Sequence, residues 1–174
     1  RLTSLARTIE VHERANVVAR VLRGLAGGRV GIVLFMPEPA HIVERAAGML
    51  SATGFRIEDH GVRLQAIHVR GGREALDAAD TASVASAMAQ AGAACLVTIG
   101  GDGTNRAVAS GWPSAVVVPL PGGTNNAFGV AIDPPAAGLA AGLYAADPGR
   151  HSGHAWQAPR LEIRIDCSVE MTTT

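Results

Sequence analysis

A single aspartate stands inside a glycine-rich turn in the stretch CLVTIGGDGTNRAVASG, from Cys95 to Gly111. An apolar run precedes the turn and a segment with helical character follows it, so the pattern predicts a strand, a loop and a helix. In open parallel sheets, ligands bind at the carboxyl ends of strands. Glycines allow a tight turn with positive φ and let a phosphate approach the backbone, where the helix offers its first amides. We therefore expect the first loop, Gly100–Thr104, to bind phosphate.

Asp102 needs a separate explanation, because a carboxylate repels bare phosphate. It suits such a loop if it holds Mg²⁺, directly or through water, or accepts the proton of an attacking hydroxyl. The plain structural alternative is a strand-to-helix turn in which Asp102 is the helix N-cap. The first loop alone leaves both interpretations open.

A second stretch, AVVVPLPGGTNNAFG, repeats the arrangement of apolar run, paired glycines, threonine and polar residues. We call residues 122–129 of this stretch the second loop. Neighbouring parallel strands end at the same edge of a sheet, so both loops are expected to open on one edge. Two such loops together indicate a binding site more than two independent turns.

The composition excludes several classes of function. The chain has 174 residues, 48% of them hydrophobic, and carries 15 basic and 15 acidic residues with no lysine. A P-loop needs a lysine and is excluded, and no basic stripe suggests nucleic-acid binding. Cys95 and Cys167 are too far apart to suggest a disulfide framework or a zinc site. No apolar run reaches the roughly 18 residues of a membrane span, so we expect a cytoplasmic protein without membrane contact.

The apolar periodicity alternates between strand and helix along residues 1–146. Such alternation predicts right-handed βαβ units and a parallel, doubly wound sheet. The run 29–36 is continuously apolar, the pattern of a strand buried on both faces. Asp133 before a proline predicts an N-cap. The remaining predicted strands cover residues 64–69, 94–99 and 114–120, and the predicted helices cover residues 17–25, 42–50, 74–91, about 104–110 and 134–146.

The pattern changes after residue 146. Residues 147–159 are polar, contain glycine and proline, and predict a linker. The segment LEIRIDCSV then alternates strictly between apolar and polar residues, which is typical of a half-exposed strand. We expect residues 160–174 to begin a second, β-rich domain that is mostly absent from this chain. Since no strand precedes the first helix, we also expect the fold to begin before Arg1.

The run GGDGTNRAVASG followed by VVPLPGGTNNAFG resembles the superfamily of NAD kinases and diacylglycerol or sphingosine-type lipid kinases. The marker of that superfamily is a Gly-Gly-Asp-Gly-Thr loop, followed in the lipid kinases by a Pro-x-Gly-Thr-x-Asn type loop. With the upstream segment HERANVVARVLRGL…VLFMPE, the chain is most similar to the ATP-NAD kinase-like proteins of acetoin catabolism, the protein X family. The resemblance covers most of residues 10–146.

The resemblance implies an ATP-dependent phosphotransferase with a three-layer α/β/α N-terminal domain of the phosphofructokinase-like type and a β-sandwich C-terminal domain. It implies ATP and Mg²⁺ as cofactors, NAD as the acceptor hydroxyl compound, and NADP biosynthesis as the result. Asp102 would be the catalytic base or would organise Mg²⁺. The residues that would contact nucleotide or acceptor are Gly100, Gly101, Gly103, Thr104, Asn105, Gly123, Thr124, Asn125 and Asn126.

One residue departs from the lipid-kinase pattern. Arg106 follows Asn105 near the place where lipid kinases usually carry an Asn-Glu pair. It removes a potential metal partner and adds a potential phosphate ligand. A lipid or other small-alcohol kinase, and a catalytically weak nucleotide-binding accessory protein of acetoin catabolism, remain the alternatives. Family members self-associate, so the resemblance also implies a homo-oligomer.

Overall fold

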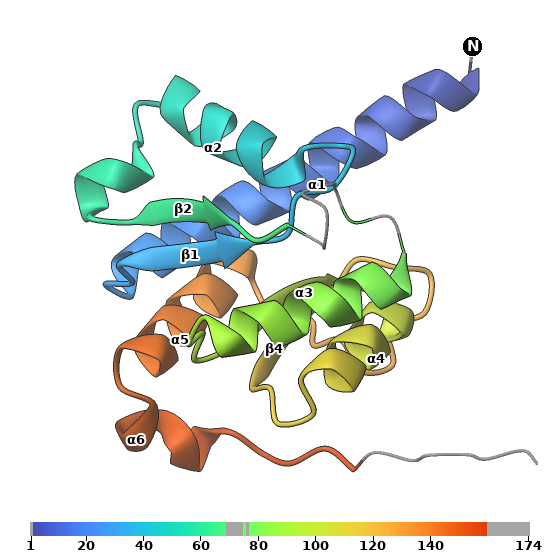
Figure 1. The fold of residues 1–174 in the computed structure, drawn as a ribbon. Coiled ribbons are helices and arrows are strands. Elements are labelled where there is room, and N and C mark those ends of the chain that lie inside the picture. Colours follow the sequence, from blue (N-terminus) through green and yellow to red (C-terminus); the bar gives the residue numbers. More distant parts are fainter. Residues whose placement is uncertain (1, 69–74, 76, 160–174) are drawn as a thin grey trace, which may run out of the picture.

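The computed structural model describes residues 2–68, 75 and 77–159. Helices and strands alternate along the chain, as the periodicity predicts (Figure 1). The strands are β1 (Ile32–Phe35), β2 (Arg63–Ala66), β3 (Leu96–Gly100) and β4 (Val117–Pro121). The helices are α1 (Leu2–Gly27), α2 (Ile42–Ala52), α3 (Ala78–Gln90), α4 (Asp102–Gly111), α5 (Pro134–Ala146) and α6 (Pro148–His151), with 3₁₀ turns η1 (Ile57–His60) and η2 (Ser152–His154).

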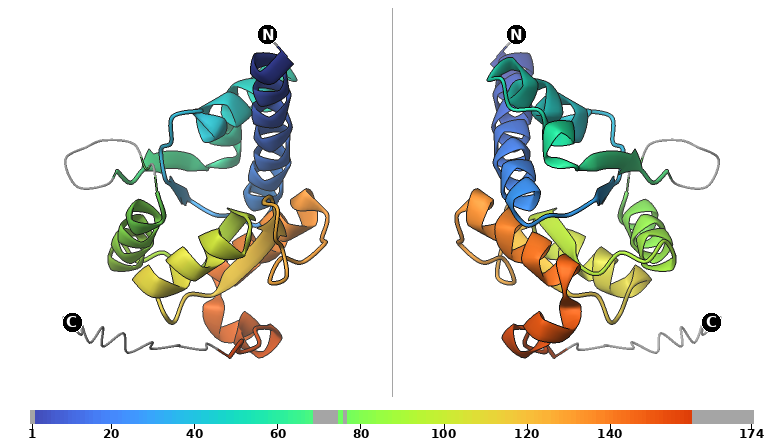
Figure 2. Two further views of the ribbon diagram at one scale, coloured as in Figure 1. Left: turned by 90° about the vertical axis from the view of Figure 1, so that its right-hand side faces the viewer. Right: turned by 90° about the vertical axis from the view of Figure 1, so that its left-hand side faces the viewer.

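The strands form two parallel pairs between two layers of helices. β1 pairs with β2 and β3 pairs with β4. Successive strand residues point to opposite sides, so Val33 packs against the core of α1, α2 and α5, while Leu34 packs against that of α3. Val97 and Leu96 repeat this division on β3. The α1/α5 and α3/α4 pairs accordingly lie on opposite sides of the strands (Figure 2). The predicted α/β fold is confirmed.

β1 is less buried than its apolar sequence predicts. The strand is only four residues long, none of them fully buried, and Ile32 is 46% exposed. In the described residues β1 has one strand neighbour, β2, and a cavity of about 530 Å³ is lined by β1 and β3. The expectation of a strand buried on both faces is therefore wrong. The side chains of β1 line the cavity and stay partly exposed.

Glycines set the distance between α1 and α5. A Cβ on Gly138 would overlap the carbonyl oxygen of Val21, and one on Gly24 would overlap that of Pro135. Since the backbones touch at these points, the two helices pack without intervening side chains. This contact holds the start of α5, and the segment that leads into it, against α1.

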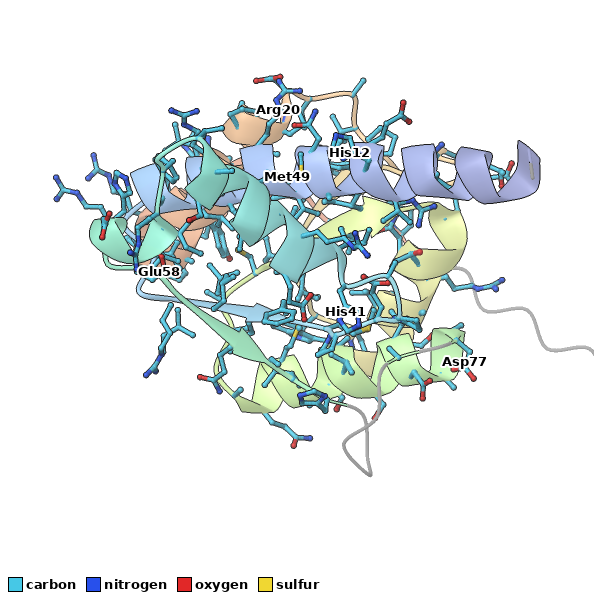
Figure 3. The ribbon with its side chains drawn as sticks, turned by 90° about the horizontal axis from the view of Figure 1, so that it is seen from above. His12, Arg20, His41, Met49, Glu58 and Asp77 are labelled. Atoms are coloured by element: carbon cyan, nitrogen blue, oxygen red, sulfur yellow. The ribbon has the colours of Figure 1, made fainter. Side chains whose placement is uncertain are left out.

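Asp133 occupies the predicted N-cap position of α5, with proline at the first helical position, but its side chain makes no cap hydrogen bond. The carboxylate instead pairs with the guanidinium of Arg20 on α1; Arg20 is labelled in Figure 3. An opposite charge within reach competes for the carboxylate oxygens, and the sequence pattern contains no sign of this long-range partner.

The predicted linker contains α6 and η2, two short helical turns in which the side chain of Asp147 accepts the amide of Arg150. The expected β-rich segment 160–174 lies outside the described residues. No helix in the described part of the chain is long and apolar enough to cross a membrane.

The α1–α5 contact makes a stability prediction. Gly138→Ala should lower the free energy of unfolding by about 1–3 kcal/mol or more, because the new methyl group has to push two backbones apart. Gly48→Ala is the matched control, since Gly48 is an exposed glycine within α2 whose added Cβ would meet nothing within 4 Å. It should raise stability by roughly 0.5–1 kcal/mol. Urea unfolding of both variants measures the difference, and equal stabilities would contradict the close contact.

Candidate functional site

The β3–β4 pairing brings the two glycine-rich loops together. Gly100, the last residue of β3, is opposite Pro121, the last residue of β4. The next residue along, Gly122, donates its amide to the carbonyl of Gly100 at 3.2 Å. The expectation that both loops open on one edge follows from this register and is met.

The glycines of the two loops permit close approach of the two backbones. A Cβ on Gly123 would lie 2.7 Å from the Cα of Gly101, and a Cβ on Gly101 would lie 2.6 Å from the carbonyl oxygen of Asn125. Neither glycine has a positive φ. The expectation that the turn uses glycines with positive φ is therefore wrong. Glycine is required at these two positions because the backbone of the other loop leaves no room for a side chain.

Asp102 joins the two loops through its backbone and its side chain. Its amide donates to the carbonyl of Asn125 at 2.9 Å. Its Oδ2 accepts the amide of Ala127 at 3.1 Å, and its Oδ1 accepts the amide of Phe128 at 2.9 Å. The N-cap of α4 is Gly101, and Asp102 is the first helical residue. The structural alternative, Asp102 as a simple helix cap, does not describe this arrangement.

Asn126 shapes the second loop from within. Its Oδ1 accepts the amides of Gly122 and Gly123 at 3.2 and 3.0 Å, and its Nδ2 donates to the carbonyl of Gly123 at 2.6 Å. This is the ordinary turn chemistry of asparagine. Thr124 and Asn125 lie at the exposed tip of the loop. Of the predicted contact residues in this loop, these two side chains are the ones open to solvent.

Asn105 supports the first loop from the interior of the protein. Only 8% of the residue is exposed. Its Oδ1 accepts the hydroxyl of Thr98 at 2.7 Å, and its Nδ2 donates to the carbonyl of Gly101 at 3.3 Å. The sequence predicts a nucleotide contact for Asn105, and the structure places its side chain inside the protein, where it holds the turn.

Several backbone amides around this edge have no hydrogen-bond partner among the described residues. They belong to Gly101 and Gly103 in the first loop, and to Thr124 and Asn125 in the second. Gly103 also has room to spare, since a Cβ there would meet nothing within 4 Å. Clustered free amides at the start of a helix form a favourable place for an anion. The local packing does not require a glycine at position 103, so its bare backbone leaves space for a ligand.

A cleft of about 320 Å³ adjoins the first loop. Met36, after β1, lines one part of it, and Gly103 and Thr104 line another. The start of α3 supplies Asp77 and Thr81 (Asp77 is labelled in Figure 3). The cleft is therefore bordered by apolar surface, two hydroxyl groups, the carboxylate of Asp77 and the first turn of α4.

Two arginines add positive charge near the loops. Arg106, the predicted phosphate ligand, is exposed on α4. Arg14 lies on α1, where its guanidinium pairs with Glu10 at 2.8 Å and donates to the carbonyl of Gly122 at 3.4 Å. Sequence reasoning missed Arg14, because no motif surrounds it and it lies 108 residues from its loop partner.

The acidic residues suit a cation that is held mainly by substrate phosphates better than a cation whose ligands all come from the protein. The described residues contain no group of three or more histidine, cysteine or acidic side chains that could hold a metal ion. Mg²⁺ usually takes one or two carboxylates together with substrate phosphates and water. Asp102 beside free amides provides such a carboxylate.

Cys95 stands apart from this edge. Its thiol donates to the carbonyl of Ala141 at 3.4 Å, and burial raises its pKa to about 11. Only the thiolate is a good nucleophile. The interpretation of Cys95 as a small packing residue fits this environment.

Comparison with known proteins identifies the family. The model of the ATP-NAD kinase N-terminal domain matches residues 6–147. The chain belongs to the ATP-NAD kinase family. A curated relative, acetoin catabolism protein X of Cupriavidus necator, is 34% identical over 145 residues. That match covers 83% of this chain and 39% of the relative, so the chain spans about two fifths of the relative's length. No solved structure matches the chain.

The hydrogen bond between Thr98 and Asn105, which supports the first loop of this ATP-NAD kinase domain, gives a second prediction. Thr98→Val keeps the side-chain shape but leaves the buried Oδ1 of Asn105 without its donor, which should cost about 1–3 kcal/mol of unfolding free energy. Thr98→Ser retains the hydroxyl and should cost less. Thermal and urea unfolding of the two variants provide the measurement. A valine variant as stable as the serine variant would show that the bond does not support the loop.

Proposed function

We propose that this domain binds the phosphates of ATP between the two loops, as part of an ATP-dependent phosphotransferase. The observation that supports this most directly is the set of free amides on both loops beside Asp102. The adjoining cleft by Met36 and Thr104 is a suitable place for the nucleoside. The family match supports the same function. Among the described residues Asp102 belongs to no cluster of three or more metal-binding side chains, which suits a cation that is held mainly by a triphosphate.

The reaction transfers the γ-phosphoryl group to a hydroxyl. The hydroxyl oxygen forms a bond to the γ-phosphorus, the bond to the β–γ bridging oxygen breaks, and ADP leaves. Asp102 receives the hydroxyl proton, or orients the cation that accompanies the phosphates. A bound Mg²⁺ supplies charge neutralisation on the phosphate oxygens. The amides of Gly101 and Gly103 hold the phosphates in place, so the protein contributes mainly positioning and electrostatic stabilisation.

NAD is the acceptor that we propose, on the strength of the family. A lipid alcohol is the second candidate, and one observation favours it. Phe128 lies near the end of the second loop and Val130 and Ile132 follow the loop; each of the three is between 37% and 47% exposed. An apolar surface beside Asp102 suits an acceptor with an apolar portion. Synthesis of NADP is the expected result if the acceptor is NAD.

A catalytically weak accessory protein is the third candidate. The relative's name refers to acetoin catabolism and states no reaction, and Arg106 lies near the place where lipid kinases usually carry an Asn-Glu pair. We propose a role linked to acetoin catabolism in either case. Cytoplasmic location and homo-oligomerisation remain predictions of the sequence.

The decisive experiment incubates the purified full-length protein with radiolabelled ATP and Mg²⁺, and offers NAD, diacylglycerol or sphingosine as acceptor. We expect labelled product from NAD. Product from a lipid alone would reject NAD as the acceptor, and no product from any acceptor would favour the accessory role.

Asp102→Asn tests the mechanism. It should reduce turnover by about 10²–10³-fold, the usual effect of removing one electrostatic contact from a transition state. Asp147→Asn is the matched control, because Asp147 also accepts a backbone amide but lies at the start of α6. The control should retain full turnover, and unchanged turnover in Asp102→Asn would contradict the proposed role.

A further inference from the structure

Asp102 makes three hydrogen bonds to one short stretch of the second loop, residues 125–128. One is made by its main-chain amide and two by its carboxylate, and a carboxylate that served only as a base or a cation ligand would need neither of the latter two. We propose that Asp102 is also a latch: its carboxylate positions the second loop against the first before any ligand arrives. In this role Asp102 is a positioning residue that acts through the tip of the second loop.

Other hydrogen bonds hold the two ends of the second loop, so the contacts of Asp102 matter for its middle. Gly122 is bound to the carbonyl of Gly100 at the beginning of the loop, and Val130 donates to the carbonyl of Pro119 just after its end, at 2.8 Å. Among the residues that the structure describes, the side chain of Asn126 binds within its own loop. Between these anchors, the hydrogen bonds from the described residues of the first loop to the second all come from Asp102. The main-chain amide of Asp102 therefore holds Asn125, and its carboxylate holds Ala127 and Phe128.

The chemistry of the contact requires two acceptors. Ala127 and Phe128 each present an N–H group to a different carboxylate oxygen. Asparagine at position 102 offers one oxygen and one NH₂ group, so one of the two amides would face a donor. Alanine offers no acceptor. The two substitutions should thus release one amide and both amides, respectively.

The latch has a consequence for ligand binding. The amides of Thr124 and Asn125 have no partner among the described residues, and both residues lie just before Ala127 and Phe128, the two that the carboxylate holds. Releasing Ala127 and Phe128 would move those amides relative to Gly101 and Gly103. A loss of nucleotide affinity in Asp102 variants would then have two sources, the missing charge and the displaced loop. The latch itself rests on the hydrogen bonds of Asp102 to the second loop, and only this consequence rests on the proposed function.

Amide hydrogen exchange followed by NMR tests the latch in the full-length, ligand-free protein. In Asp102→Ala the amides of Ala127 and Phe128 should both exchange at least about tenfold faster than in wild type, since each loses a hydrogen bond to a charged group. In Asp102→Asn only one of the two should accelerate to that extent. The amide resonances of Thr124 and Asn125 should shift in both variants.

Asp147→Asn is again the control. It should alter the amide of Arg150, whose partner is the Asp147 carboxylate, and leave Ala127 and Phe128 unchanged. Unchanged protection of core amides in α5 shows that a variant is folded, and Asp102→Asn is the milder variant if Asp102→Ala fails this check. Wild-type exchange rates at Ala127 and Phe128 in the folded Asp102 variants would overturn the latch.

Adding Mg²⁺ with a non-hydrolysable ATP analogue separates the latch from the proposed function. Resonance shifts at Gly101 and Gly103 in the wild type support nucleotide binding. If those amides do not respond while the exchange of Ala127 and Phe128 still depends on Asp102, the latch stands and the nucleotide site is rejected.

Discussion

The close approach of two backbones, at Gly101 and Gly123, is the constraint on which the site depends. The Cα of one glycine occupies the space that a side chain on the other would need. Parallel pairing in a register that ends both strands together brings the loops to this contact. A wider separation of the loops would draw the amides of Ala127 and Phe128 away from the carboxylate of Asp102. Any side chain at either glycine would therefore disturb the aspartate as well as the loops.

The rest of the domain holds these loops from several directions. Asn105 and Thr98 support the first loop from inside, and strand residues that point alternately into two cores fix β3 between its helices. The second loop leads, through Asp133 and its pair with Arg20, into α5, which touches α1 at bare backbone. An exposed ion pair contributes at most about 1 kcal/mol. Backbone packing of α5 on α1 is therefore the stronger restraint on this side.

The sequence predicts the α/β order, the parallel pairing and the meeting of the two loops, because periodicity and glycine turns are local signals. The hydrogen bonds that join the Asp102 carboxylate to the amides of Ala127 and Phe128 span 25 and 26 positions of sequence. They are not local, and no sequence pattern reveals them. The same applies to Arg14, and to Arg20, which draws Asp133 away from its cap. The burial of β1 also depends on a neighbour, since a continuous apolar run does not specify how many strand partners it has.

These contacts answer the objection that a carboxylate does not belong in a phosphate site. Each Asp102 oxygen already accepts an amide N–H from the second loop, so part of its negative charge is offset within the protein. The amides of Gly103 and Thr124 remain available on the two loops. A carboxylate held in this way keeps its remaining lone pairs for a cation or a proton. In an open loop the carboxylate would repel a polyanion, but here the bonds that hold the loops together also offset part of its charge. One residue can therefore support the loops and take part in phosphate chemistry.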